Sequence, residues 1–528
     1  MALKDKTECL QARTVLWYLV FVGFAINYLL RVNLNIAIVS MVKTKAKSNT
    51  SLTSECIAPT HLKLINVTLD NPNITASSIS NVEIVVAEKF QGFEWSEYEQ
   101  SLVLGAFFWL HWTTQIPGGI LANKYGAKLV FGVGNFIGIL LCFFIPTASL
   151  MSYKWLISLR IVQGFIAGAC WPAMHSMTAR WIPPNERSKF VTAYLGSSVG
   201  AGLTFPLCGI IIDLWGWEYV FYVSGILGTL WYAAWYFLVF DSPSEHPRIS
   251  EDEKEYILSS LGGSVAKRTT SVPWKALLTS MPVWINVFTQ FGGLWGLFTL
   301  LTHAPLYLKL IHGWNMTSTG FFAGLPHFGR MLFAYIVSII ADYLLRNNKI
   351  SRTNVRKIAT FLSSILQGCC MIALAQSGCN SIMALVFLTA ATTVHGAVST
   401  GALPNLVDLS PNYASVLLGF ANGSGAIGGM ISPLIVGLLT NNNQTTAQWQ
   451  IVFWISAVIL LVSGTSFLIF GKSDLQSWNS PNSQLEKVLN ESELVTLNKE
   501  KQSNQCCNNN RKIDCDNTHK TDDKSNSV

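Results

Sequence analysis

The feature that most constrains this chain is a series of about a dozen long apolar runs separated by shorter polar segments. A helix that crosses the hydrocarbon core of a bilayer needs about 20 predominantly apolar residues. Charged residues make up only 12% of the chain, about half the proportion found in soluble proteins. The pattern predicts an all-α, polytopic membrane protein. It excludes a soluble enzyme, a nucleic-acid-binding protein and a secreted disulfide-rich scaffold as descriptions of the whole chain.

The apolar runs divide into two groups of six. A polar segment at 241–280 separates the groups, and its stretch 249–261 has the amphipathic pattern of a short surface helix. The expected spans are 14–42, 98–122, 129–148, 155–178, 190–212, 219–240, 281–302, 318–341, 358–376, 382–406, 413–439 and 450–470. The expected organisation is a cytosolic N-terminus (1–13), a six-helix half (14–240) with a long outside loop (43–97), a central cytosolic loop (241–280), a second six-helix half (281–471) and a disordered cytosolic tail (472–528).

The distribution of basic residues predicts the orientation. With both termini in the cytosol, the inside segments before the tail carry 18 Lys and Arg, whereas the short outside loops carry only Lys154 and Lys309. Cys56 and Cys379 also fall on outside loops, which allows a disulfide between them. Five glycosylation sequons fall on outside loops as well, at Asn49, Asn66, Asn73, Asn315 and Asn443.

The two groups of spans echo each other in sequence. Span five contains glycines and Pro206 and is followed by Trp217-Glu-Tyr-Val-Phe; span eleven contains glycines and Pro433 and is followed by Trp449-Gln-Ile-Val-Phe. Glycines at roughly helical spacing let two helices approach closely. Two related six-helix halves predict a transporter that works by alternating access around a central site.

Several motifs resemble those of a known group of proteins. The loop after span two reads Gly119-Ile-Leu-Ala-Asn123-Lys124-Tyr-Gly126-Ala-Lys128, and the segment after span four reads Trp181-Ile-Pro-Pro-Asn-Glu186-Arg187-Ser-Lys. The first motif resembles the major facilitator superfamily. The second, with Arg31-Val-Asn in span one and Arg160-Ile-Val-Gln in span four, resembles the anion:cation symporter family, which holds type I sodium/phosphate cotransporters, sialin and vesicular glutamate transporters.

This resemblance implies a major facilitator fold and a secondary active transporter of an organic or inorganic anion, which would be phosphate-like or a carboxylate. It implies no enzymatic activity and no cofactor, with sodium or a proton as the coupling ion. The sequence also contains no Walker motif that would indicate ATP-driven transport. The resemblance covers roughly residues 14–475.

Three arginines, namely Arg31, Arg160 and Arg330, are the formal charges in the interior of the expected spans. Glu99 is the second residue of the span 98–122, and no other Asp, Glu or Lys falls inside a span. A buried membrane charge costs about 2.5–3.5 kcal/mol on insertion scales and normally faces a partner or a cavity. With no acidic partner, the simplest counter-ion is an anionic substrate, which a guanidinium suits well. The alternative is that each arginine bonds to backbone carbonyls or snorkels. The resemblance places Arg31 and Arg160 in the anion site, and it leaves Arg330 as a cavity or coupling residue without a family counterpart.

Other positions depart from the family pattern. Relatives that transport glutamate have a glutamate at the position of Ala167, histidines at those of Leu104 and Leu406, and an arginine at that of Gly293. The departures argue against glutamate as the substrate and against a sialin-type proton mechanism, and they favour the phosphate-cotransporter branch. If one group replaces the missing acid, we expect it to be His111, on span two.

The resemblance also predicts a cytoplasmic gate. Its first part consists of Gly119, Asn123, Lys124, Gly126, Lys128, Glu186 and Arg187, and its second part consists of Asp342 and Arg346. Charged members would pair with one another and with helix ends when the cytoplasmic side is closed. Asn123 replaces the usual aspartate, which weakens the latch and favours the inward-open state. The alternative is an ordinary set of positively charged inside loops.

A second function stays open from sequence alone, namely a transport-deficient anion sensor or scaffold of the same fold. The expected partners are a small anionic substrate and membrane lipid, with no nucleic acid, and the expected oligomeric state is a monomer. The cytosolic segments show no acidic dileucine signal. The plasma membrane is therefore preferred over a vesicular or lysosomal membrane.

Overall fold

The computed structural model describes residues 11–43, 56, 92–183, 186, 190, 192–261, 272–347 and 349–479. The first half contains α1 (Ala12–Met41), α4 (Glu97–Gly105), η1 (Ala106–Phe108), α5 (Gln115–Tyr125), α6 (Ala127–Phe143), α7 (Ile145–Met151), α8 (Tyr153–Ala167), α9 (Cys170–Trp181), η3 (Thr192–Leu195), α11 (Gly196–Trp215) and α12 (Trp217–Leu238). The polar linker contains η4 (Pro243–Glu245), α13 (Glu251–Leu261) and α14 (Trp274–Thr279). The second half contains α15 (Met281–Leu310), α16 (Met316–Arg346), α17 (Arg352–Thr360), η6 (Phe361–Leu366), α18 (Gln367–Ala375), α19 (Ser381–Val394), η7 (His395–Ser399), α20 (Ala402–Leu409), η8 (Pro411–Tyr413), α21 (Ala414–Thr440) and α22 (Thr446–Phe470), and η9 (Ser477–Asn479) follows it.

The described part of the chain has nine helices that are long and apolar enough to cross a membrane, or ten if the pair α6–α7, bent by 47°, is one span. The other two expected spans correspond to the broken rod α4–η1–α5 and to α15. All twelve expected apolar runs are thus helical, and the all-α prediction is confirmed. The expected straight span at 98–122 is in fact interrupted at 109–114, just before Pro117, a residue that cannot continue the helical hydrogen bonding.

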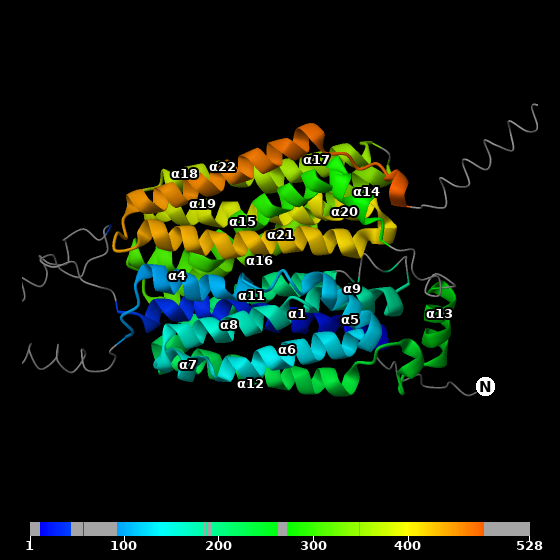
Figure 1. The fold of residues 1–528 in the computed structure, drawn as a ribbon, viewed down its shortest axis with the longest axis horizontal. Coiled ribbons are helices and arrows are strands. Elements are labelled where there is room, and N and C mark those ends of the chain that lie inside the picture. The colour runs from blue at the N-terminus through cyan, green and yellow to red at the C-terminus, as the bar shows by residue number, and fades with distance from the viewer. Residues whose placement is uncertain are drawn as a thin grey trace, which may run out of the picture.

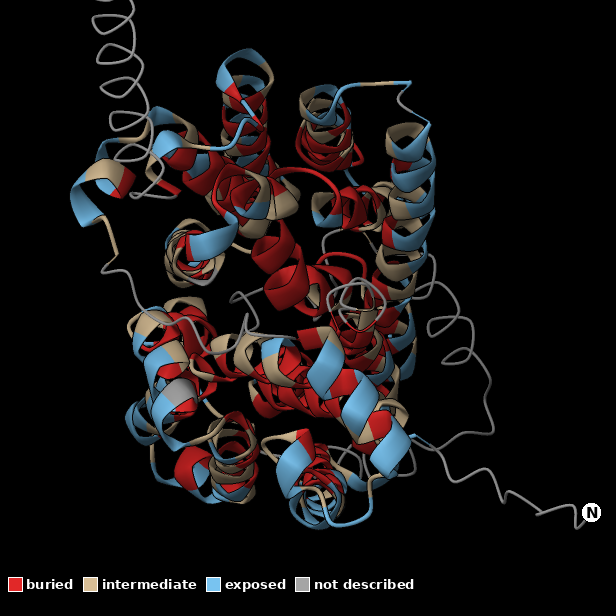
Figure 2. Ribbon diagram, turned by 90° about the vertical axis from the view of Figure 1, so that its right-hand side faces the viewer, coloured by how far each residue is buried: buried red, intermediate tan, exposed pale blue. Residues whose placement is uncertain are grey.

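The two halves lie side by side as two layers of helices (Figure 1). Across the boundary, α11 packs along α16 and α4 packs along α21. The repeat seen in the sequence has a structural counterpart, since Trp217 begins α12 and Trp449 lies in the first turn of α22, each 1% exposed. Buried residues gather at the centre of each half, with exposed residues on the outer surface (Figure 2).

The bundle has two distinct ends, which we call the α13 end and the Cys56 end. At the Cys56 end, a disulfide joins Cys56 to Cys379, as the sequence allowed. Polar contacts join the halves at three places in this part of the bundle. Asn35 Nδ2 donates to the Leu301 carbonyl oxygen (3.1 Å), Thr317 donates to Asp213 Oδ2 from its backbone N (2.9 Å) and its hydroxyl, and Asn442 N donates to Glu97 Oε2 (3.0 Å).

At the α13 end, no described ion pair joins one half to the other. The expected surface helix is α13, and its Glu253 accepts hydrogen bonds from the backbone N–H groups of Ala12 (3.0 Å) and Arg13 (3.2 Å) at the start of α1. A carboxylate at a helix N-terminus satisfies free N–H groups and complements the helix dipole.

The segment after α22 differs from the expected disordered tail in its first residues. The Leu409 carbonyl accepts from Gln476 N (2.9 Å), and Asn479 Oδ1 accepts from the Ser410 hydroxyl (2.8 Å). Residues 472–479 therefore pack against the end of α20, and the rest of the expected tail lies outside the described residues.

Candidate anion site

Arg31 lies on α1 and is only 4% exposed. Its guanidinium lies against three aromatic rings, with Cζ 4.7 Å from the centroid of Tyr28, 4.9 Å from Phe107 and 5.7 Å from Phe108. Within the described part of the chain, Nε and Nη2 of Arg31 have no hydrogen-bond partner. Aromatic faces attract a cation, but they cannot accept its hydrogen bonds as an oxyanion can.

Arg160 lies on α8, is 1% exposed and has different contacts. Its Nη1 donates to the Leu30 carbonyl (3.0 Å) and to Gln163 Oε1 (3.1 Å), and its Nη2 donates to the Arg31 carbonyl (2.9 Å). The two arginines therefore meet, as expected, but Arg160 directs both Nη atoms to the backbone of α1, and Nη1 also bonds to Gln163. This is the alternative that the sequence left open for a membrane arginine. The Nε of Arg160 has no partner among the described residues.

In the part of the chain that the structure describes, no carboxylate lies in the middle of a bundle helix. Each one in a bundle helix lies near an end of that helix: Glu97, Glu99, Asp213, Glu218, Asp342 and Asp408. Asp213 and Asp408 belong to helices that run a few residues beyond the expected spans. Among the described residues, Arg31 thus has no acidic partner at its own depth.

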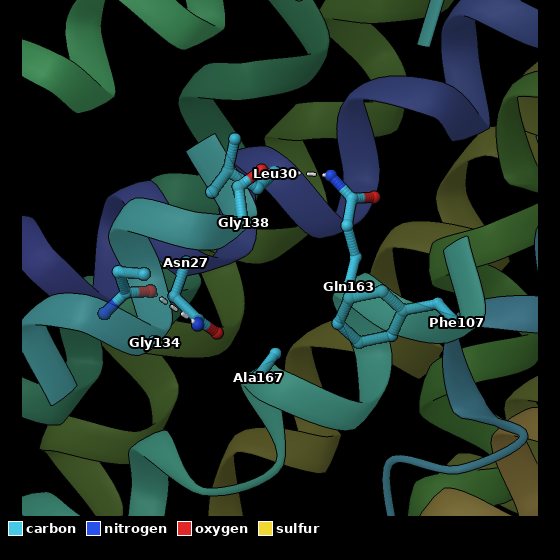
Figure 3. Close-up of a pocket in the computed structure, with 8 residues that line it drawn as sticks. Asn27, Leu30, Phe107, Gly134, Gly138, Gln163 and Ala167 are labelled. Atoms are coloured by element: carbon cyan, nitrogen blue, oxygen red, sulfur yellow. Dashed lines mark hydrogen bonds between the residues drawn. The ribbon is translucent and has the colours of Figure 1, made fainter. Parts of the chain in front are cut away.

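A small cavity lies beside Ala167 (Figure 3). It offers about 10 Å³ of space for the centre of a water molecule, and its polar lining consists of Asn27, Asn135 and Gln163. Asn27 Nδ2 donates to Asn135 Oδ1 (2.8 Å), and Asn27 Oδ1 has no partner among the described residues. A polar hollow of this size can hold about one water molecule. Ala167, where the resemblance implies a glutamate in relatives, therefore borders a small cavity that contains three amide side chains.

His111 is 5% exposed and lies between α5 and α8. Its Nδ1 is 3.0 Å from the Gly164 carbonyl oxygen, and its Nε2 is 3.2 Å from Gln115 Nε2. A neutral ring with its proton on Nδ1 satisfies both contacts. Close packing fixes this arrangement, because a β-carbon at Gly164 would lie 1.7 Å from the Phe107 carbonyl oxygen.

Arg330 lies near the middle of α16 and is partly exposed. Its Nη1 donates to Ser198 Oγ on α11 of the other half (3.3 Å). Tyr28, whose ring lies against Arg31, comes from the other half as well. Sequence reasoning missed Tyr28 and Ser198, since neither carries a formal charge and neither belongs to a motif.

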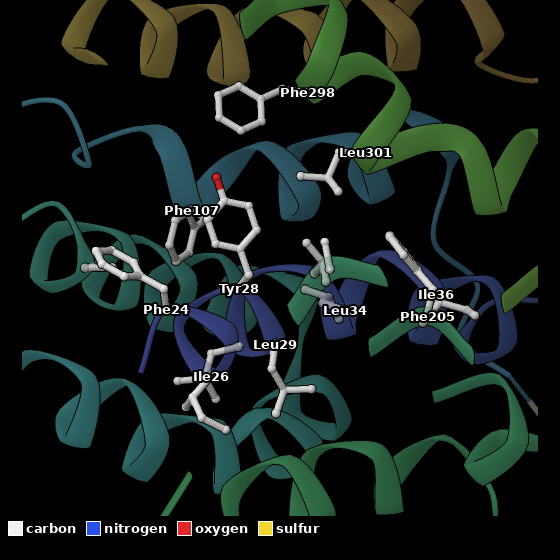
Figure 4. Packing of buried hydrophobic residues seen from close by; sticks show 14 of the residues in the cluster. Phe24, Ile26, Tyr28, Leu29, Leu34, Ile36, Phe107, Phe205, Phe298 and Leu301 are labelled. Carbon is white, nitrogen blue, oxygen red and sulfur yellow. The ribbon is translucent and has the colours of Figure 1, made fainter. Parts of the chain in front are cut away.

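On the side that faces the second half, the surroundings of Arg31 are apolar. Tyr28 and Phe107 face Phe298 and Leu301 of the second half, and the Tyr28 hydroxyl points toward that half (Figure 4). The ring centroids of Phe108 and Phe298 are 4.7 Å apart. Low polarity strengthens the interaction between a guanidinium and an anion.

The structure places part of the predicted gate around the start of α6. Gly126 has a positive φ of 99°, and a β-carbon there would lie 2.3 Å from Asp241 Oδ2. Asp241 Oδ1 accepts from Lys128 N (2.9 Å), and the Lys128 ammonium lies 4.6 Å from the Phe240 ring centroid. Lys124 lies over the ring of Tyr125. Asp241 is a member of this cluster that sequence reasoning missed.

Other predicted gate residues are distributed differently. Glu186 pairs with Arg13 and accepts from the Tyr256 hydroxyl (3.1 Å), which ties the loop after α9 to α1 and α13. Gly119 meets only an ordinary contact, 3.5 Å from Pro172 Cβ, and the tight crossing of α5 with α9 lies at Gly118. Arg187 and the side chain of Asn123 lie outside the described residues.

In the second half, Asp342 and Arg346 are both exposed on α16, and the described structure holds no ion pair between them. The ion pairs recorded there join Asp408 of α20 to Arg356 of α17 (2.8 Å) and to Arg352 (3.6 Å). In the second half, the ion pairs therefore join α17 to α20, and not Asp342 to Arg346 as the sequence predicted.

Two of the five expected glycosylation sites lie in the described part of the chain. Asn315 is exposed and caps α16 by accepting from Ser318 N (2.7 Å), and Asn443 lies in the turn between α21 and α22. Asn49, Asn66 and Asn73 lie outside the described residues.

Comparisons with known proteins agree with this architecture. The family model described as Major Facilitator Superfamily matches residues 20–433 and 348–501. The chain is 38% identical to sialin of Homo sapiens over 89% of this chain and 91% of that protein. It is 34% identical to vesicular glutamate transporter 3 of Danio rerio, over 92% of this chain and 78% of that protein. It is 32% identical to a Drosophila melanogaster protein named for inorganic phosphate cotransport, over 93% of this chain and 90% of that protein.

A solved structure shows a similar fold. It is a bacterial homolog of the human lysosomal transporter Spinster, in an inward-facing and occupied conformation, with a TM-score of 0.59 and 13% identity over 87% of this chain and 96% of that one. Together with the matched family model and the relatives above, this fold shows that the chain belongs to the major facilitator superfamily of membrane transporters, in the group that includes sialin and the vesicular glutamate transporters.

Proposed function

We propose that this chain is a secondary active transporter that carries a small organic or inorganic anion across a membrane by alternating access. The observation that carries the proposal is Arg31, a 4% exposed guanidinium with two unpartnered donor atoms and no described carboxylate at its depth. A buried unpaired charge is costly. An anionic substrate would offset that cost by supplying both the charge and the missing acceptors.

The distribution of contacts between the halves supports alternating access. The polar contacts near the Cys56 end join the two halves, whereas the described ion pairs Arg13–Glu186 and Arg356–Asp408 at the α13 end each stay within one half. Closing the α13 end would need rotation of one half against the other, and the packed pairs α11–α16 and α4–α21 supply the surfaces for that motion.

The chemistry of the substrate follows from the arginine and its surroundings. A guanidinium binds carboxylate and phosphate groups through paired hydrogen bonds. The relatives are named for glutamate and for inorganic phosphate, which are both anions. We therefore propose a carboxylate or phosphate-like anion, with sodium or a proton as the coupling ion, or with the membrane potential as the driving force.

Topology and location complete the proposal. Both termini lie in the cytosol, which puts the α13 end inside and the Cys56 end outside, in agreement with the positive-inside count. The plasma membrane is the proposed location, with a vesicular or lysosomal membrane as the alternative, and the proposed functional unit is a monomer.

Uptake by purified protein in liposomes tests this function. Radiolabelled inorganic phosphate, glutamate, succinate and benzoate would be offered with and without a sodium gradient, at two pH values. Saturable counterflow of one anion without an imposed ion gradient is the expected result, and it would eliminate the sensor alternative. Anion-dependent thermal stabilisation without counterflow for any member of the panel would instead favour the sensor or scaffold.

A further inference from the structure

Arg330 is a charged residue in the middle of the second half, and few of its hydrogen-bond donors have a partner in the described structure. The hydrogen bond to Ser198 Oγ, at 3.3 Å, is the one recorded for its guanidinium among the described residues. A guanidinium carries five N–H donors. The residue is only partly buried, and its bond to Ser198 of the other half places the guanidinium at the boundary between the halves.

Two buried histidines lie near Arg330 in the fold. His327 is 3% exposed and precedes Arg330 by one turn of α16, and His395 is 1% exposed and adjoins Gly396, which packs on the Arg330 backbone. Both ring nitrogens of His395 and Nδ1 of His327 have no partner among the described residues. Buried polar atoms in folded proteins are almost always satisfied. Unpaired imidazole nitrogens beside a cation therefore indicate a missing acceptor or donor.

The backbone holds these groups together. A β-carbon at Gly396 would lie 2.3 Å from the Arg330 carbonyl oxygen, so η7 packs directly on α16 at this point. On the other side of His395, a β-carbon at Gly293 would lie 3.5 Å from Nε2. Gly396 lets η7 lie close to α16, and Gly293 lets α15 lie close to the imidazole of His395 without a side chain in the way.

Tyr28 connects this cluster to the first half. Its ring lies against Arg31, and its hydroxyl points toward the second half (Figure 4). Arg330 bonds to Ser198 of α11, and α11 packs along both α1 and α16. An oxyanion group between Tyr28 and Ser198 would therefore face one guanidinium from each half.

We propose that Arg330 and His395 form the second half's share of the anion site, with both donating hydrogen bonds to an oxyanion group of the substrate. This inference rests on the proposed transport function. The substrate oxygen takes the place of the Ser198 hydroxyl at Arg330, while Arg31 supplies the opposing charge from α1. The substrate is thus held from both halves, as alternating access requires for an occluded state.

The test is uptake kinetics in proteoliposomes, with whichever anion of the panel gives the highest wild-type counterflow. The variants are Arg330→Gln, Arg330→Lys, Ser198→Ala, His395→Phe and His395→Gln. Lys309→Gln is the control for the loss of one positive charge from the second half. His303→Phe is the matched control for His395, since His303 is also 1% exposed and has two unpartnered ring nitrogens. Size-exclusion profiles confirm folding of each variant.

The expected result is a rise in KM of about 10- to 100-fold for Arg330→Gln, as for the loss of a charge-assisted hydrogen bond. Arg330→Lys should recover part of the affinity, His395→Phe should raise KM more than His395→Gln, and both controls should keep the wild-type KM. Ser198→Ala should also keep the wild-type KM.

Two results would overturn the inference and leave the proposed transport function intact. One is an unchanged KM in Arg330→Gln; the other is a Ser198→Ala variant that reproduces the full defect of Arg330→Gln, which would make Arg330 a structural link between the halves. In both cases the wild-type protein still shows counterflow. Absence of counterflow in the wild-type protein would contradict the proposed function itself.

Discussion

Arg160 donates a hydrogen bond from Nη2 to the backbone carbonyl oxygen of Arg31, 2.9 Å away. The neighbouring carbonyl, that of Leu30, accepts from Nη1 of the same guanidinium at 3.0 Å. One side chain of α8 thus bonds to two successive peptide units of α1, at the position where the Arg31 side chain projects from that helix. The two arginines appear alike in the sequence, but their contacts give them different roles, and mutation should separate these roles.

Arg31→Ala should abolish anion uptake and leave the fold intact. The substitution removes a cation whose Nε and Nη2 bond to nothing in the described structure, so little stabilisation is lost with it. Arg160→Ala should also abolish uptake, and it should lower stability by about 1–3 kcal/mol because Gln163 and two backbone carbonyls lose their donor. Counterflow in liposomes and thermal melting in detergent measure the two effects.

Arg160→Lys is the control for this pair, because an ammonium keeps the charge but cannot reproduce the forked geometry of a guanidinium. We expect the melting temperature of Arg160→Lys to lie between those of the wild-type protein and Arg160→Ala, and its uptake to be lower than that of the wild-type protein. Near-normal uptake in Arg31→Ala would remove that residue from the site, and wild-type melting of Arg160→Ala would show that its three hydrogen bonds contribute little.

Gly126→Ala should destabilise the protein, and Gly119→Ala should not, although both glycines belong to the same motif. At Gly126 the backbone has a φ of 99° and Asp241 fills the space of a β-carbon, whereas at Gly119 the added methyl meets Pro172 Cβ at an ordinary 3.5 Å. A strained backbone conformation costs about 1–3 kcal/mol. Melting curves of the two variants compare the sites directly; equal melting temperatures would mean that Asp241 moves aside without cost.

The disulfide between Cys56 and Cys379 should protect both thiols from reagents outside the cell. A membrane-impermeant maleimide added to intact cells should label the protein strongly only after reduction. The same labelling should be absent from the Cys56→Ser/Cys379→Ser double variant, treated identically. Labelling without reductant would show that the bond does not form in cells, and no labelling after reduction would contradict the proposed orientation.

Glycans should occupy some of Asn49, Asn66 and Asn73, because the loop that carries them is long, polar and placed outside by the count of basic residues. Treatment with an endoglycosidase should increase the mobility of the protein on a gel. The triple Asn→Gln variant should already migrate at the faster position, and enzyme treatment should then change nothing. A wild-type band that is insensitive to the enzyme would contradict this prediction.

The sequence predicted the features that depend on local composition. Apolar runs matched to bilayer thickness located the spans, and the amphipathic stretch at 249–261 located α13. The position of Arg31 near Arg160 also followed from sequence, since both fall in the same part of their spans and match family motifs. These signals lie within short segments or within a recognised pattern.

The contacts that define individual roles could not be predicted in the same way. The bond from Arg330 to Ser198 joins residues 132 positions apart, and the bond from Arg160 to Arg31 joins residues 129 apart. Such pairs depend on which helix faces meet and how closely. The hydroxyl of Ser198 and the carbonyl of Arg31 carry no sequence signal of their role, because every hydroxyl and every peptide group offers the same chemistry.

Ala167→Glu should introduce acid-stimulated uptake. Ala167 lines a polar cavity with Asn27, Asn135 and Gln163, whose amide groups can hydrogen-bond a carboxyl group. When ionised, the added carboxylate would compete with the substrate for the positive field of Arg31 and Arg160. Burial at the position of Ala167 disfavours the ionised form of the added carboxyl group. Protonation removes this competition, so uptake should be higher at about pH 5.5 than at about pH 7.5.

Ala167→Gln is the matched control, because it has nearly the same size as the glutamate and cannot bind a proton. It should show the shallow pH dependence of the wild-type protein. His111→Gln should do the same, since both ring nitrogens of His111 already have partners in the neutral form. Strong acid stimulation of the wild-type protein that persists in His111→Gln would mean that another group carries the proton. His395, which has two unpartnered nitrogens beside Arg330, would then be the first residue to replace.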